Sequence, residues 1–229
     1  MRTEEESSAW IRGMFGRVAP RYDLLNRVLS LQVDRLWRWR TARILAPTIR
    51  PDSIVLDLAC GTGDLLQALE NAAPARYIGA DFCHPMLIRT RSKSRAPLVE
   101  ADGLRLPVAD SSIDLITIAF GFRNFVNYPK GLVEVLRVLK PGGQLAILEF
   151  TQPPSIFVRG FMRVWNGWVI HPIGRWLSGQ DDAYEYLPES VQRFPDGPKL
   201  AAMMTTAGFS QVSYRYFDLG IAALHLGRK

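Results

Sequence analysis

Short apolar runs alternate with longer amphipathic stretches from about residue 52 onward. The runs are rich in Val, Ile and Leu without polar alternation, a pattern typical of strands buried on both faces of a parallel sheet. The first five predicted strands are Ser53–Leu58, Arg76–Ala80, Leu98–Ala101, Ile113–Ala119 and Gln144–Glu149. Their alternation with helical stretches predicts βαβ units and an α/β fold with a mostly parallel sheet.

Helical stretches separate most of these strands. They are predicted at Asp64–Asn71, Pro85–Ser92 and Pro129–Leu139. A turn is predicted at Lys140–Gly143, because a Pro followed by two Gly stops a helix.

The simple alternation ends near residue 154. Residues 155–194 are rich in Trp, Phe and Arg and predict an inserted helical cap. A final helix, Lys199–Ala207, precedes a strand pair, Gln211–Phe217 and Ile221–Leu226. The prediction is therefore a seven-stranded sheet with helices on both faces, in one domain.

Composition narrows the class of protein. The chain has 229 residues, 48% of them hydrophobic, which suffices for one sizeable core. Residues 1–50 hold ten Arg and five acidic residues, and so most of the formal net charge of +6.

The two cysteines, Cys60 and Cys83, fit neither a disulfide framework nor a metal motif, which favours a reducing, cytoplasmic compartment. We find neither a signal peptide nor an apolar run of about eighteen residues that could span a membrane.

The first predicted strand runs into a glycine-rich turn. Asp57 lies in the strand, Gly61, Thr62 and Gly63 form the turn, and a helix follows. Glycines suit a turn with positive φ and let a ligand approach the backbone closely. The dinucleotide fingerprint needs a third Gly where Leu66 stands, so the loop fits NAD poorly.

Acidic residues follow the next two strands. Asp81 comes about twenty residues after the loop, where a carboxylate can accept from both hydroxyls of a ribose. Asp102 and Gly103 follow the third strand, placed to reach an adenine amino group. Each feature alone also fits a tight turn or a solvated loop, but together they line the carboxyl edge of one sheet.

This arrangement resembles the Rossmann-like class I methyltransferase fold. The resemblance implies that the Gly loop receives the methionine part of S-adenosylmethionine and that the two acids hold ribose and adenine. Ala119, at the end of the fourth strand, is expected beside the same cofactor. The sulfonium makes its methyl group electrophilic without a metal, so no metal site is expected.

Further motifs resemble the ubiquinone/menaquinone biosynthesis C-methyltransferases over nearly the whole chain. They are Tyr22–Asn26 with Ser30 and Trp37, Phe120–Asn124, Arg137–Gly143 with Leu148–Thr151, Tyr184–Leu187, Met203–Met204 with Ala207–Phe209, and Gly220–His225. The expected organisation is an N-terminal helical segment (1–50), a cofactor-binding core (51–154), the cap (155–194) and a C-terminal helix and strand pair (195–229). The sequence departs from the family pattern at Asp34 (usually His), Thr151 (often Ser) and Ala119 (commonly Ser).

The resemblance implies methylation of a ring carbon in a prenylated quinol, in the menaquinone or the ubiquinone pathway. We expect Arg123 to stabilise a developing phenolate, Asn124 to orient the hydroxyl or a water, and Tyr22 to help close the pocket. The alternative is that Arg123 forms a surface ion pair and Asn124 caps a helix.

Residues 156–177 combine aromatic and arginine side chains with no acid. The residues concerned are Phe157, Phe161, Trp165, Trp168, Trp176, Arg159, Arg163 and Arg175. Such a stretch can lie at the cytoplasmic face of a membrane, or it can be a lid over an apolar pocket.

Two other functions stay open at this point. The first is a noncatalytic nucleic-acid-binding domain that uses the arginines and tryptophans of residues 35–43. It leaves the Gly loop and the strand-end acids unexplained, so we expect no nucleic-acid partner. The second is a class I methyltransferase acting on RNA or another small molecule. The oligomeric state is also open, with a homodimer as one alternative.

Overall fold

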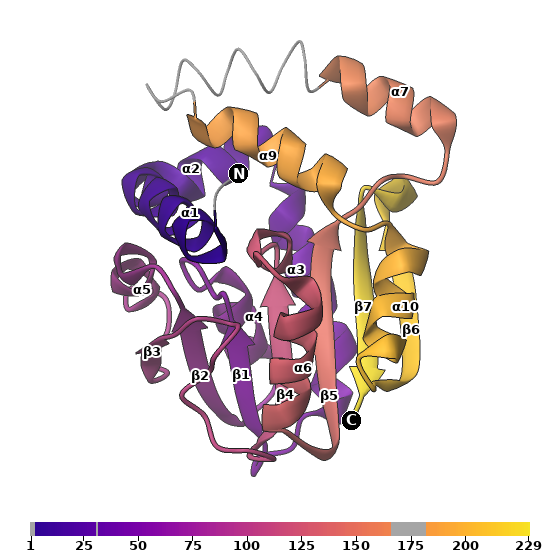
Figure 1. The fold of residues 1–229 in the computed structure, drawn as a ribbon. Helices are drawn as coiled ribbons and strands as arrows, with labels where there is room; N and C mark the ends of the chain where they lie inside the picture. Colours follow the sequence, from indigo (N-terminus) through magenta and orange to yellow (C-terminus); the bar gives the residue numbers. More distant parts are fainter. Residues whose placement is uncertain (1–2, 31, 166–181) are drawn as a thin grey trace.

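A seven-stranded sheet forms the centre of the protein. The computed structural model describes residues 3–30, 32–165 and 182–229 (Figure 1). The strands are β1 Ile54–Leu58, β2 Arg76–Asp81, β3 Leu98–Glu100, β4 Ile113–Ala119, β5 Leu139–Phe150, β6 Ser210–Phe217 and β7 Ala222–Arg228. They lie in the order β3-β2-β1-β4-β5-β7-β6. The first five are parallel, and β7 is antiparallel to both β5 and β6. The predicted fold class is confirmed.

The strand order places the loops that matter for function. From β1 the chain moves outward to β2 and β3, and then crosses back to β4 on the other side of β1. Ligands of open α/β sheets bind outside the carboxyl ends of the strands at such a reversal. The loops after β1, β2 and β4 therefore meet at one edge.

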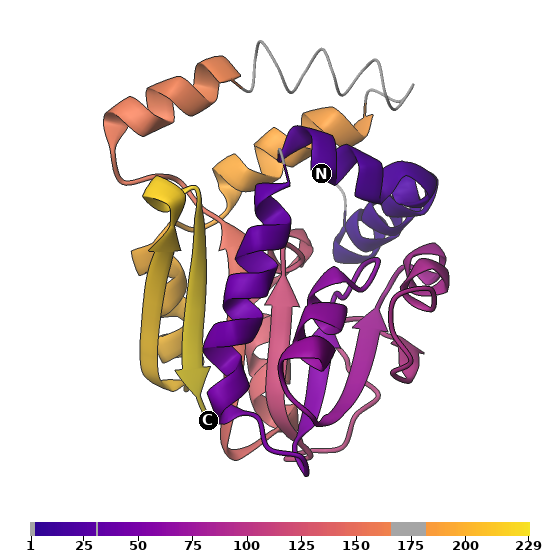
Figure 2. The same cartoon turned by 180° about the vertical axis from the view of Figure 1, so that it is seen from behind.

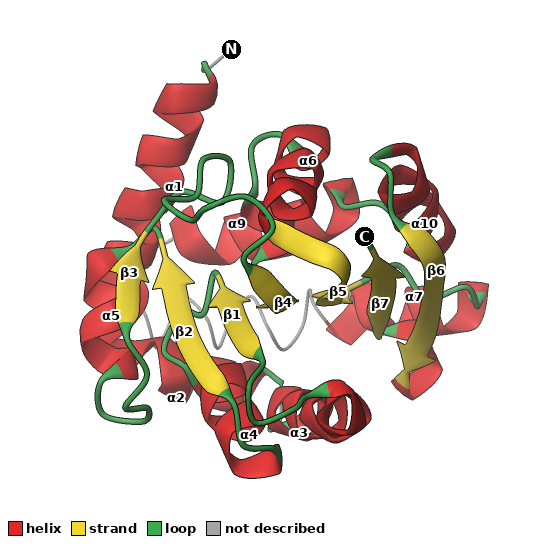
Figure 3. Ribbon diagram, turned by 90° about the horizontal axis from the view of Figure 1, so that it is seen from below, coloured by secondary structure: helices red, strands yellow, loops and turns green. Residues whose placement is uncertain are grey.

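Helices cover both faces of the sheet (Figure 3). One face carries α6 (Tyr128–Val138) and α10 (Gly197–Thr206), and the other carries α3 (Val33–Leu45) and α4 (Asp64–Ala72). Along β1, Leu56 packs in the first of these cores and Val55 in the second. Burial on both faces explains why the strands read as continuous apolar runs.

The segment Lys140–Gly143 corrects one prediction. Helix α6 does end before it, but the segment is an irregular part of β5 rather than a turn between elements. Leu139 pairs with Ile113 and Gln144 pairs with Leu115, so the intervening residues bulge out. Gly142, at φ +79°, keeps the backbone in the sheet by donating to the carbonyl of Lys229.

Further helices lie over the carboxyl edge of the sheet (Figures 1 and 2). They are α1 (Glu4–Val18) and α2 (Tyr22–Leu29) from the N-terminal segment, and α7 (Ile156–Trp165) and α9 (Asp182–Arg193) from the predicted cap. A short 3₁₀ helix, η1 (Ala19–Arg21), joins α1 to α2, and α5 (His84–Thr90) lies beneath it. Residues 166–181 of the predicted cap lie outside the described residues.

Candidate active site

A cavity opens at the carboxyl edge, between the strand-end loops and the N-terminal helices. Most of the residues predicted to form the site line it: Tyr22, Asp57, Gly61, Thr62, Asp81, Asp102, Gly103, Ala119 and Asn124. Ser8 and Phe15 of α1 also line it, so the N-terminal segment forms its roof. The sequence motifs that follow four different strands are thus brought together around one space.

The two loop glycines have different tasks. Gly63 has φ +85° and lies directly before α4, and a side chain there would approach Cγ2 of Thr90 to 2.6 Å. Gly61 has φ +57° with open space where a side chain would be, and it lines the cavity. Gly63 therefore allows the loop to pack closely against Thr90, whereas Gly61 leaves room for a ligand against the backbone.

Two buried carboxylates form the floor of the cavity. Asp81 accepts hydrogen bonds from the backbone N–H groups of Gly61 (2.8 Å) and Cys83 (2.9 Å). Burial raises the pKa of Asp81 to about 6 and that of Asp57 to about 7. Asp57 Oδ1 accepts from the hydroxyl of Thr117 at 2.7 Å, whereas its buried Oδ2 has no hydrogen-bond partner among the described residues. An unpaired buried oxygen of this kind fits a cationic group that donates hydrogen bonds.

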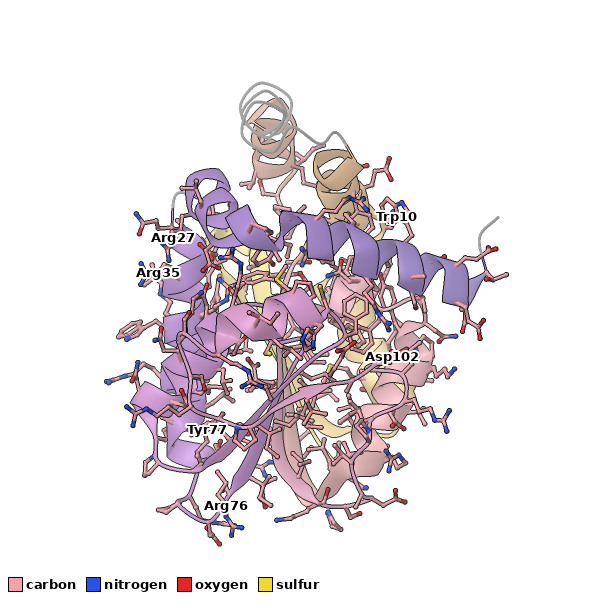
Figure 4. The ribbon with its side chains drawn as sticks, turned by 90° about the vertical axis from the view of Figure 1, so that its left-hand side faces the viewer. Trp10, Arg27, Arg35, Arg76, Tyr77 and Asp102 are labelled. Carbon is pink, nitrogen blue, oxygen red and sulfur yellow. The ribbon has the colours of Figure 1, made fainter. Side chains whose placement is uncertain are left out.

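Asp102 lies on the exposed rim, on the loop after β3 and beneath α1 (Figure 4). Its Oδ1 accepts from the backbone N–H of Leu104 at 2.9 Å. The neighbouring Gly103 is buried, and a side chain there would come within 2.3 Å of the Phe125 ring. This part of the cavity therefore combines an aromatic face with a carboxylate.

A polar cluster ties the roof to the Gly loop. Asp23 of α2 accepts from the Thr62 hydroxyl at 2.6 Å, and its other oxygen pairs with Lys93 at 2.6 Å. Lys93 also pairs with Asp64 at 2.6 Å. Partial burial opposes ionisation of Asp23, but the hydrogen bonds from Lys93 and Thr62 hold its pKa below the usual value. Sequence reasoning missed Lys93, which belongs to none of the motifs.

Arg123 lies in η3 (Phe122–Asn124), a 3₁₀ helix after β4, and it is buried. Its Nη1 pairs with Glu149 at 2.8 Å and also donates to the carbonyl of Phe120, and its backbone N–H donates to Glu149 at 3.2 Å. Burial opposes the charge, yet Glu149 keeps the pKa of Arg123 above its ordinary value. Arg123 therefore forms an ion pair, though not the surface pair that was the alternative. Glu149 was missed as a site residue, although it lies in a matched motif.

A second cavity adjoins the first. Asn124, Phe125 and Val126 line both, and Arg123 lines only the second. Trp10, Tyr128 and Tyr186 add aromatic surface to it. The buried Nε of Arg123 has no hydrogen-bond partner among the described residues, so one donor of this guanidinium group stays unpaired.

Asp34, at the position where the family usually has His, has a structural role. It is buried in an ion pair with Arg38 and accepts from the Ser30 hydroxyl at 2.5 Å. The guanidinium group of Arg38 in turn lies 4.8 Å from the centre of the Phe120 ring and lines the first cavity.

The sequence departs from the family pattern at two further positions. Ala119 lines the first cavity. Thr151 is buried, and its hydroxyl has no hydrogen-bond partner among the described residues.

Helix α3 argues against the nucleic-acid alternative. Trp37 and Arg38 are buried, and Trp37 donates its indole N–H to Asp218. Arg40 also pairs with Asp218, at 3.4 Å, and Arg43 lies over the Trp39 ring. Burial of Trp37 and Arg38 removes two of the side chains that this alternative requires, whereas Arg35, Trp39 and Arg43 are exposed.

Comparisons with known proteins give the family. The profile of the ubiE/COQ5 methyltransferase family matches residues 1–229. The chain belongs to this family. A demethylmenaquinone methyltransferase of Thermus thermophilus is 50% identical over 220 residues, which cover 93% of this chain and 99% of that protein. The ubiquinone/menaquinone biosynthesis C-methyltransferase UbiE of Dinoroseobacter shibae is 39% identical over 234 residues, which cover 99% of this chain and 93% of that protein. The resemblance found in the sequence motifs is confirmed.

Solved structures agree on the fold. A SAM-dependent methyltransferase of Thermotoga maritima superposes with a TM-score of 0.66 at 16% identity, covering 95% of this chain and 99% of that one. A second SAM-dependent methyltransferase, from Aquifex aeolicus, superposes with a TM-score of 0.55 at 17% identity. The match covers 82% of this chain and 88% of that one. The class I methyltransferase fold is thus shared at low sequence identity.

Proposed function

We propose that this chain transfers a methyl group from S-adenosylmethionine to a ring carbon of a prenylated quinol precursor. Demethylmenaquinol and the corresponding ubiquinone precursor are the two candidates. The observation that carries the proposal is the pair of adjoining cavities at the carboxyl edge, one lined by acidic strand ends and the other by aromatic side chains. The names of the relatives at 50% and 39% identity point to the same chemistry.

The residues of the first cavity fit S-adenosylmethionine. The unpaired Oδ2 of Asp57 suits the ammonium group of the methionine part, beside the backbone of Gly61. Asp81 has oxygen lone pairs left for the ribose hydroxyls, and Asp102 with Phe125 suits the adenine. When bound, the cofactor supplies an electrophilic methyl group on a positively charged sulfur.

The second cavity suits the quinol ring. The ring carbon becomes nucleophilic when the neighbouring hydroxyl, with a reference pKa of about 10, loses its proton. The free Nε–H of Arg123 and the amide of Asn124 can stabilise the oxygen that gains charge. A well-placed donor of this kind is worth roughly 3–4 kcal/mol in the transition state. Glu149 balances the charge of Arg123 and holds it in place.

A prenylated substrate favours work at a membrane surface. Ile156 and Phe157 at the start of α7 are 68% and 86% exposed, and Leu219, in the connection between β6 and β7, is 77% exposed. Helix α7 and the connection between β6 and β7 lie at the same end of the molecule as the carboxyl edge (Figure 1). We propose that this end contacts the cytoplasmic face of the membrane.

In the described ranges, no helix is long and apolar enough to cross a bilayer. Trp168, Trp176 and Arg175 of the predicted stretch lie outside the described residues.

The test is methyl transfer from labelled S-adenosylmethionine to reduced demethylmenaquinol and ubiquinone-precursor analogues, assayed side by side. We expect label in at least one quinol, with binding of the cofactor measured separately by calorimetry. Tight cofactor binding with no transfer to either quinol would keep the methyltransferase fold and refute the substrate.

A further inference from the structure

Tyr186 lies where three elements meet above the second cavity. It belongs to α9, and its hydroxyl donates to Asn124 Oδ1 of η3 at 3.0 Å. Its ring packs edge-on against Trp10 of α1, with the ring centroids 5.5 Å apart (Figure 4 shows Trp10 on α1, beside α9). Tyr186 and Asn124 are 62 positions apart, so the contact forms only when the cap folds back over the sheet edge.

The direction of this hydrogen bond sets the orientation of the Asn124 amide. An asparagine offers one accepting oxygen and one nitrogen with two donors. With Oδ1 facing the Tyr186 hydroxyl, Nδ2 is turned away from it, and among the described residues no group accepts from Nδ2. Asn124 lines both cavities, so this free donor is available at their junction.

Tyr186 is suited to remain a donor. Burial raises the pKa of Tyr186 above its ordinary value, although Arg123 and Arg193 oppose the shift. The phenol therefore keeps its proton throughout the pH range in which a quinol substrate is stable and assayed. An ionised phenol would accept rather than donate, and it would favour the opposite orientation of the amide.

We propose that Tyr186 is a positioning residue, which holds the Asn124 amide so that Nδ2 donates to the quinol oxygen beside the methylated carbon. The inference rests on the proposed function. As this oxygen loses its proton to solvent, the ring carbon forms a bond to the methyl group, and the broken C–S bond leaves its electron pair on sulfur. The hydrogen on that carbon is then lost and the hydroxyl is regained, so the net release is one proton.

This arrangement links the position of α9 to the chemistry. The Trp10 ring supports Tyr186, and the hydrogen bond from Tyr186 selects the orientation of the Asn124 amide that serves the quinol oxygen. A bound quinol thus meets a pre-oriented donor.

The first variant is Tyr186→Phe, which keeps the ring and removes the hydroxyl. We expect kcat for the quinol to fall about tenfold, the loss of one modest hydrogen bond in the transition state. The Kd of S-adenosylmethionine should stay within about twofold. The pH at which kcat rises should move upward, because an oxygen that has lost its donor ionises at higher pH. A purely structural role for Tyr186 would not shift this pH profile.

A double-variant cycle with Asn124→Ala tests whether Tyr186 acts through Asn124. If it does, Y186F should cost nothing further in the N124A background. Tyr214→Phe is the matched control, since Tyr214 lies on β6 and stacks on His225, away from both cavities. It should match the wild type in kcat and in the pH profile.

The outcomes separate this inference from the proposed function. An active wild type with an equally active Y186F, or with additive losses in the double variant, would overturn the positioning role alone. A wild type that binds S-adenosylmethionine but methylates no quinol would overturn the proposed function, and the role of Tyr186 with it.

Discussion

The floor and the roof of the first cavity are held by different kinds of interaction. In the floor, Asp81 is fixed by two backbone N–H groups, and Asp57 by a buried hydroxyl at the end of a strand inside the core. In the roof, the contacts are between side chains nearer the surface: Asp23 with Lys93 and Thr62. Tyr186 makes contacts of the same kind with Trp10 and Asn124 above the second cavity.

The difference separates the tasks of the two regions. Hydrogen bonds to fully buried carboxylates inside a packed core break only with substantial unfolding. Side-chain pairs between a helix and a loop at the edge of the fold can open locally without loss of the fold. The fixed groups of the floor are therefore suited to select which ligand binds. The roof is suited to open for exchange of substrate and product.

The largest effect is expected at Arg123, which lines the second cavity. Arg123→Ala should lower the free energy of unfolding by roughly 3–5 kcal/mol, because it leaves the Glu149 carboxylate buried without its partner. Methyl transfer should be lost as well. Denaturant titration and the transfer assay measure the two effects.

A double variant separates the structural role of Arg123 from its proposed catalytic role. Arg123→Met with Glu149→Gln removes both charges, keeps an acceptor for the N–H groups of Arg123 and Phe150, and should recover most of the stability, but not the methyl transfer. If the double variant regained full activity, the role of Arg123 would be structural only.

The next largest effect is expected at Asp81. Asp81→Ala leaves the N–H groups of Gly61 and Cys83 without acceptors, which costs about 1–3 kcal/mol for each group that stays buried. It also removes the proposed ribose ligand, so calorimetry should show at least a hundredfold loss of S-adenosylmethionine affinity. Unchanged affinity would place the ribose elsewhere.

The pH dependence of stability is a third test of the floor. The pKa of Asp57 is about 7 in the folded chain, against about 3.9 in an unfolded one. Between these values the folded state holds a proton that the unfolded state lacks. The free energy of unfolding should therefore fall as pH rises from about 4 to 7, with Asp57 contributing up to roughly 1.4 kcal/mol per pH unit. Asp81, with a pKa of about 6, adds to this slope below pH 6. Asp57→Asn should remove the Asp57 part of the slope in ligand-free protein, most clearly between about pH 6 and 7, and an unaltered slope there would contradict the assignment.

The smallest change in stability is expected in the roof. Lys93→Met breaks the pairs with Asp23 and Asp64, whose side chains are mostly buried, and should cost roughly 1.5–3 kcal/mol of unfolding free energy, less than the change at Arg123. Stopped-flow measurements should nevertheless show release of S-adenosylmethionine several-fold faster, because α2 is no longer held to the Gly loop. Lys199→Met, which breaks an exposed pair with Asp196, is the control and should leave the release rate unchanged.

The sequence predicted the floor better than the roof. Strands β1 and β2 are apolar runs, the Gly loop follows β1, and Asp81 ends β2, so the local sequence pattern was enough to predict these features. The Asp23–Lys93, Tyr186–Asn124 and Arg123–Glu149 contacts join residues far apart in the chain. No local periodicity encodes such pairs, which depend on how the helices fold back over the sheet. The segment Lys140–Gly143 was mistaken for a turn because its pairing with Lys229 is likewise nonlocal.

The most direct test of carbon methylation uses a demethylmenaquinol analogue with deuterium on the acceptor ring carbon, incubated with S-adenosylmethionine carrying a labelled methyl group. Mass spectrometry and NMR of the product would follow both labels. We expect the product to gain the labelled methyl group on the ring and to lose the deuterium from the same carbon. A product that carries the methyl group on oxygen and retains its deuterium would contradict this expectation.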